Sequence, residues 1–78
     1  MTRATVKLNS ILKRLSSLPD DKEVVFLPDG SCIKDLLVYL NLGRGEVEII
    51  LMNGSLVNET KIIENDSFIE LYPIFGGG

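Results

Sequence analysis

The clearest helical pattern of the sequence lies near its middle, and strand-type segments flank it on both sides. Apolar residues recur there at i, i+3, i+4 and i+7: Ile33, Leu36, Leu37 and Leu40. This spacing predicts one helix with a single apolar stripe. Ser31 is a suitable N-cap, and Cys32 takes that position if the helix begins one residue later. Asn41-Leu42-Gly43 predicts the end of the helix, because Gly43 adopts the left-handed conformation easily.

Four other segments have the alternation or composition of β-strands. In Ala4–Leu8, the side chains of Val6 and Leu8 fall on one face, as in a half-buried strand. The other three predicted strands are Lys22–Leu27, Glu46–Met52 and Ser67–Tyr72. Toward its end Glu46–Met52 is apolar at every position, which favours burial on both faces. The segment Ser10–Leu18 fits either a turn of helix or an irregular hairpin connection.

Turn signals separate these segments: Pro28-Asp29-Gly30, Asn53-Gly54 and Glu64-Asn65-Asp66. Asn53-Gly54 is the strongest of them, and Leu56 and Val57 after it form a short additional strand. The order is strand, strand, helix, strand, short strand, strand. This order predicts an α+β fold, in which one main helix packs on one face of a mixed sheet of four to five strands.

The composition excludes several classes of chemistry. The 78 residues include no histidine and one cysteine, so zinc and iron–sulfur constellations and Ser–His or Cys–His nucleophiles are excluded. No internal disulfide can form, and the N-terminus lacks a signal pattern, so we expect a cytoplasmic protein. No apolar run is long enough to span a bilayer. Cys32 is interpreted as an inert small hydrophobe.

The charge pattern bears on the partners. The net charge is −3 and no basic stripe appears, so nucleic acid is a poor candidate partner. A mildly acidic surface suits docking onto a basic protein patch instead.

The last predicted strand runs through Pro73-Ile74-Phe75 into Gly76-Gly77-Gly78. A terminal glycine triplet has no use as a cap or turn, and glycine has the largest backbone freedom of any residue. Such a tail passes through a narrow channel and presents the carboxylate of Gly78 to a partner. We therefore expect residues 1–75 to form a single domain and residues 76–78 a flexible tail.

Several pieces of the sequence, taken in order, are similar to one protein family: Val6–Leu8, Val24–Gly30, Ile33–Leu37, Met52–Gly54 and Leu71–Gly78. They resemble the MoaD/ThiS family of β-grasp, ubiquitin-like sulfur carriers. The pre-tail proline is closer to the molybdopterin synthase small subunit, whereas a triple glycine is more familiar from thiamine-type carriers. Asn65 stands where the family usually has glycine, at a position where asparagine also tolerates a positive φ.

The resemblance implies a carrier rather than an enzyme. In this family a ubiquitin-activating-type enzyme uses ATP and Mg²⁺ to adenylate the terminal glycine, here Gly78, which becomes a thiocarboxylate. Gly76 and Gly77 would form the tail, and the residues before it would contact the partner: Tyr72, Pro73, Ile74 and Phe75. Phe75 fits the core as well as it fits an interface. The chain itself would bind no cofactor or metal.

The implied partners are the adenylating enzyme, a sulfur donor such as a cysteine desulfurase or rhodanese, and the large subunit of molybdopterin synthase. Three other functions stay open: a thiamine-type carrier, a ubiquitin-like modifier joined to lysines through Gly78, and a non-covalent β-grasp interaction module. Neither nucleic acid nor a membrane is an expected partner.

Overall fold

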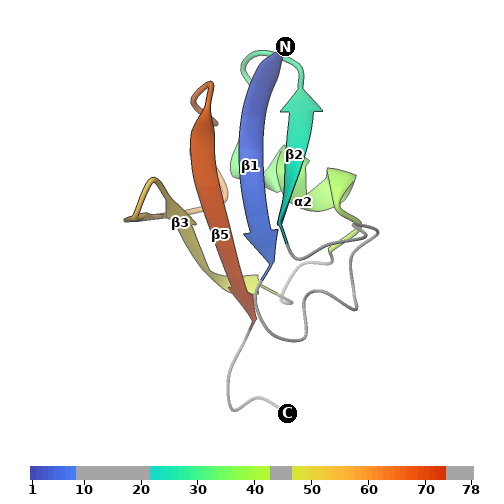
Figure 1. Ribbon diagram of the computed structural model, residues 1–78. Helices are drawn as coiled ribbons and strands as arrows, with labels where there is room; N and C mark the ends of the chain where they lie inside the picture. Colours follow the sequence, from blue (N-terminus) through green and yellow to red (C-terminus); the bar gives the residue numbers. More distant parts are fainter. Residues whose placement is uncertain (9–21, 43–46, 74–78) are drawn as a thin grey trace.

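A five-stranded mixed sheet with one helix across its face makes up the part of the chain that this computed structural model describes, residues 1–8, 22–42 and 47–73 (Figure 1). The elements in chain order are β1 (Thr2–Leu8), β2 (Lys22–Leu27), α2 (Ile33–Tyr39), β3 (Val47–Met52), β4 (Ser55–Val57) and β5 (Ser67–Pro73). The predicted α+β architecture is confirmed. The segment Ser10–Leu18, for which two interpretations stood open, lies outside these residues.

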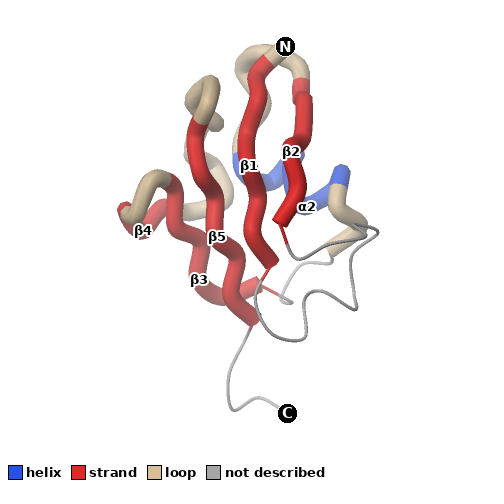
Figure 2. Tube along the Cα trace, viewed as in Figure 1, coloured by secondary structure: helices blue, strands red, loops and turns tan. Residues whose placement is uncertain are grey.

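The strands lie in the order β2-β1-β5-β3-β4, so the last strand of the chain occupies the middle of the sheet (Figure 2). β1 pairs antiparallel with β2 and parallel with β5. β3 pairs antiparallel with both β4 and β5. β5 is therefore held on both sides by backbone hydrogen bonds along its length.

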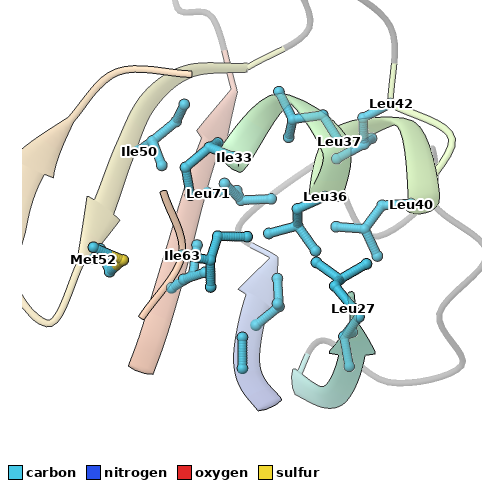
Figure 3. Packing of buried hydrophobic residues seen from close by; sticks show 14 of the residues in the cluster. Leu27, Ile33, Leu36, Leu37, Leu40, Leu42, Ile50, Met52, Ile63 and Leu71 are labelled. Carbon is cyan, nitrogen blue, oxygen red and sulfur yellow. The ribbon is translucent and has the colours of Figure 1, made fainter. Parts of the chain in front are cut away.

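The core lies between the sheet and α2 (Figure 3). Alternation in β1 turns Ala4, Val6 and Leu8 toward the helix, and each is almost completely buried. The predicted apolar stripe of α2 meets them: Ile33, Leu36, Leu37 and Leu40 are all buried. Removing such side chains from water is the main source of stability in a domain of this size.

Among the described residues α2 covers one face of the sheet, and the partial exposure of the opposite face overturns the expectation that β3 is buried on both faces. Ile50 and Met52 face the core and are buried. Ile49 and Leu51 point to the opposite face and stay half-exposed. No helix within the described ranges has the length and apolar character needed to cross a bilayer.

The Asn53-Gly54 turn forms as predicted. Both residues have positive φ, 53° and 84°, as a tight β3–β4 hairpin requires. Asn53 also ties this hairpin to β5, because its N–H donates to the carbonyl of Phe68 at 2.7 Å and its Oδ1 accepts the Phe68 N–H at 2.8 Å.

The ends of α2 are determined by Cys32 and Asn41. Cys32 is the N-cap residue, the second of the two predicted possibilities, and its N–H donates to the Asp35 carboxylate at 2.9 Å. The helix ends at Tyr39 with Leu40 as its C-cap, and Asn41, rather than the predicted Gly43, takes the left-handed conformation that terminates it, with φ 62°. The Leu42 N–H then donates to the carbonyl of Leu37 at 2.9 Å, which completes a Schellman-type end.

Candidate docking face and the strand that leads to the tail

The residues predicted to act lie at and beyond the end of β5. Leu71 is buried, Tyr72 is half-buried, and Pro73 closes the strand opposite Val47 of β3. Pro73 stands at the last residue of a central strand, where its missing N–H removes little of the ladder. The other predicted site residues lie outside the described part of the chain: Ile74, Phe75, Gly76, Gly77 and Gly78.

Tyr72 keeps its proton in this environment. Its hydroxyl lies 3.3 Å from Oε2 of Glu70 and donates to that carboxylate. Partial burial, followed by the negative charge of Glu70, raises the pKa of Tyr72 above its usual value. Tyr72 is therefore a neutral hydrogen-bond donor at the end of β5, and its hydroxyl is hydrogen-bonded to Glu70.

The sheet face away from α2, called here the open face, carries apolar side chains that the sequence analysis did not single out. Figure 1 views the sheet from this side, with α2 behind it. Val24 and Phe26 of β2 are 46% and 54% exposed, and Leu56 of β4 is 72% exposed. The same face carries four half-buried side chains from β3 and β5: Ile49, Leu51, Phe68 and Tyr72.

The strand register brings these side chains into rows across the sheet. Val24 lies opposite Thr5, which lies beside Phe68, and Leu51 lies opposite Leu56. The signal was present in the run Val24–Leu27, which is apolar at every position. Because one helix covers one face, half of such a run must remain on the other face.

Charged groups interrupt this apolar surface at two places. At one end, Arg3 contacts Asp66 in the turn before β5, with Nε 2.6 Å from Oδ1. Nearer the tail, Lys7 of β1 lies directly opposite Lys22 of β2 and beside Glu70 of β5.

Cys32 has a structural placement at the start of α2. It is half-buried, and its Sγ lies 3.4 Å from Oδ2 of Asp35. The hydrogen bond from the backbone N–H of Cys32, with a smaller contribution from its thiol, lowers the pKa of Asp35. Within the described ranges, no group of three or more potential ligand side chains gathers to hold a metal ion.

Solved structures share this architecture over almost the whole chain. A Pyrococcus furiosus protein assigned as molybdopterin converting factor, subunit 1, matches with a TM-score of 0.75 and 20% identity, over 94% of this chain and 98% of that one. Small archaeal modifier protein 1 of Haloferax volcanii matches with a TM-score of 0.72 and 13% identity, over 94% and 98%.

A third solved structure is a complex of subunits 1 and 2 of molybdopterin-converting factor from Helicobacter pylori. One of its chains matches with a TM-score of 0.63 and 17% identity, over 99% of this chain and 100% of that one. No family model and no curated protein sequence matches the chain. At these identities the comparisons establish the architecture: this chain shares the β-grasp fold of these solved structures.

Proposed function

We propose that this chain is a cytoplasmic sulfur carrier whose C-terminal Gly78 is adenylated by a partner enzyme and converted to a thiocarboxylate. The observation that carries the proposal is the central position of β5. This strand ends at Pro73, and the sequence then continues through two apolar residues into three glycines. A tail attached to a strand that is paired on both sides has a fixed origin, which favours accurate delivery of its end to a partner.

The chemistry requires activation, because a carboxylate is a poor electrophile. The partner would bind ATP and Mg²⁺, and an oxygen of the Gly78 carboxylate would attack the α-phosphorus while pyrophosphate leaves. A sulfide sulfur would then attack the acyl carbon and release AMP, which leaves the thiocarboxylate. With a persulfide donor the terminal sulfur would attack instead, and a thiol would then reduce the resulting acyl disulfide to free the thiocarboxylate. The partner would stabilise the charge on the transferring phosphoryl group, so this chain acts as substrate and carrier, without a cofactor of its own.

The three terminal glycines would let the end of the chain enter the active site of the partner. Three extended residues reach roughly 10 Å, and without β-carbons they fit a narrow channel. Residues Tyr72–Phe75, directly before the glycines, would contact the partner at the channel entrance. The sulfur would most naturally serve molybdopterin formation, in line with the solved structures assigned to molybdopterin-converting factor, whose complex with subunit 2 suggests a large-subunit partner. The sulfur source would be a cysteine desulfurase or rhodanese.

A second candidate function is protein modification through Gly78. The similarity to small archaeal modifier protein 1, with a TM-score of 0.72, favours it. Both functions use the same acyl-adenylate and differ in the nucleophile, which is sulfur in one case and a lysine amine in the other. Thiocarboxylated free chain supports the carrier, whereas isopeptide-linked conjugates in the native host support the modifier.

The test is an intact-mass measurement. The chain is incubated with the adenylating enzyme of its host, ATP, Mg²⁺ and a sulfur source. We expect one oxygen to be exchanged for sulfur, with the change in the C-terminal peptide and Cys32→Ala fully competent. Native protein must also show Gly78 as its last residue.

A one-residue extension beyond Gly78 is the matched negative control. Each added residue moves the carboxylate by up to about 3.5 Å, and a misplacement of about 1 Å can cost about 100-fold in rate. An extended chain that is modified as fast as the native one contradicts the proposal, because the modification then does not depend on the carboxylate of Gly78.

A further inference from the structure

The open face is apolar and uncovered by any described element. Val24 and Phe26 are each about half exposed, and Phe68 lies in the same row as Val24. Scattered exposed apolar residues are ordinary, but a sheet face to which β2, β5, β3 and β4 all contribute apolar side chains marks a surface that another molecule covers.

The charge of this face is opposite in sign to that of the whole chain. The net charge is −3, yet the described charged groups on the open face are mostly cationic. Arg3 is neutralised by Asp66. What remains is Lys7 and Lys22 against the single carboxylate of Glu70, which already accepts the hydroxyl of Tyr72.

The two lysines stand in an unfavourable arrangement in the free chain. They occupy directly opposite positions of an antiparallel pair, where like charges repel. Among the described residues, neither ammonium group lies within ion-pair distance of a carboxylate. A carboxylate supplied from outside would relieve this repulsion.

The lysine pair also lies beside the part of β5 that leads from Phe68 to its end. Along β5, Phe68 comes first, Glu70 lies beside Lys7, and Tyr72 follows at the tail end. A partner that holds residues beyond Pro73 and also covers Phe68 must pass over Glu70, with Lys7 beside it on β1 and Lys22 next to Lys7 on β2.

We propose that the open face docks a protein partner that presents carboxylates to Lys7 and Lys22, framed by an apolar surface against Val24, Phe26 and Phe68. This replaces the expectation of a basic partner surface, which rested on the net charge. The inference names the surface chemistry of the adenylating partner and therefore rests on the proposed function.

The test measures adenylation by the host adenylating enzyme. ATP–pyrophosphate exchange is the readout, and the chain is the varied substrate. For the double variant Lys7→Glu/Lys22→Glu we expect KM to rise about tenfold with kcat within about twofold, because a docking contact contributes uniform binding. Lys34→Glu on α2, an exposed lysine away from the open face, makes the same charge change per site and should leave KM within about twofold.

Salt provides a second readout. Between 50 mM and 500 mM NaCl, KM of the native chain should rise several-fold, while KM of Lys7→Gln/Lys22→Gln should change much less. Thermal melts of this neutral variant should show an unchanged or higher Tm, which separates lost docking from lost folding.

The outcomes are separable. If the native chain supports no exchange, the proposed function fails and the inference fails with it. If exchange is normal but the lysine variants behave like Lys34→Glu, only the acidic partner surface is wrong. A dimer in sedimentation equilibrium, or binding of a single-stranded oligonucleotide, that requires both lysines would assign the face to another occupant and overturn the inference.

Discussion

Arg3 at the start of β1 holds Asp66 in the turn before β5 through both side chain and backbone. Its Nε and Nη2 lie 2.6 Å and 2.5 Å from Oδ1 of Asp66, and the Asp66 N–H donates to the Arg3 carbonyl at 2.6 Å. The Arg3 N–H also donates to Oδ1 of Asn65 at 2.9 Å. These contacts set the point at which the parallel pairing of β1 and β5 begins.

Asp66 combines an exposed ion pair with a left-handed backbone, φ 62°, which the sequence had suggested for Asn65. Asp66→Asn should cost less than about 1 kcal/mol, because asparagine tolerates this φ and only the exposed pair is lost. Asp66→Val should cost about 1–2 kcal/mol more, because a β-branched residue is strained there. Urea denaturation measures both, and the cost of Asp66→Asn should disappear in 1 M NaCl.

Gly54 and Gly30 allow the same test of backbone strain at two turns, because both have positive φ and open surroundings. Their φ values are 84° and 88°, and a β-carbon added at either would meet no atom within 4 Å. Gly54→Ala and Gly30→Ala should therefore each lower the free energy of unfolding by about 1–2 kcal/mol through conformation alone. A much larger loss at either site would mean that a contact, rather than φ, makes glycine necessary.

Replacing Ser67 by alanine should increase the stability of the fold. Its hydroxyl is buried, with the residue 2% exposed, and has no hydrogen-bond partner among the described residues. Ser67→Ala removes an unsatisfied polar group and should stabilise the chain by about 1 kcal/mol. Thr2→Ala is the contrast, because its hydroxyl donates to Asp29 at 2.9 Å and its removal should destabilise. A loss for Ser67→Ala would show that the hydroxyl is satisfied in solution.

Asp35 should contribute to the acid sensitivity of the fold. The hydrogen bond from the Cys32 backbone lowers its pKa below the ordinary value of 3.8. A lowered folded-state pKa means stability that is present above pH 3.8 and is lost as the pH falls through the folded value. Urea midpoints of Asp35→Asn should therefore fall less steeply than those of the native chain between pH 4 and pH 2. Parallel curves would exclude this capping contact as a source of acid sensitivity.

Alanine substitutions should distinguish core residues, which affect stability, from docking residues, which affect binding. Leu37 is 8% exposed and belongs to the core, so Leu37→Ala should cost about 2–5 kcal/mol of stability. Phe26→Ala, on the open face, should cost much less stability. It and Phe75→Ala should instead weaken binding to the adenylating enzyme by about 1–3 kcal/mol. Thermal melts beside binding titrations check this, and a melt that places Phe75→Ala below Leu37→Ala would make Phe75 a core residue.

Local patterns in the sequence predicted the elements and several of their boundaries. The stripe Ile33–Leu40 predicted α2, and Asn53-Gly54 predicted the hairpin between β3 and β4. These predictions succeeded because each depends on residues that are neighbours along the chain, through helical periodicity or turn geometry. The site was predicted from the tail and the residues before it, of which Tyr72 and Pro73 lie in the described part.

The arrangement in space required the tertiary structure. The middle position of β5 depends on pairing with β1, which precedes it by about sixty residues, and no local pattern encodes such a contact. Asn41 rather than Gly43 is the left-handed residue that terminates α2, because the Leu42 N–H then satisfies the carbonyl of Leu37. The sequence by itself determined which residues are apolar and how they alternate. The packing of α2 against one face decided that Val25 and Leu27 are core while Val24 and Phe26 remain on the open face, because one layer of helix covers one face of a sheet.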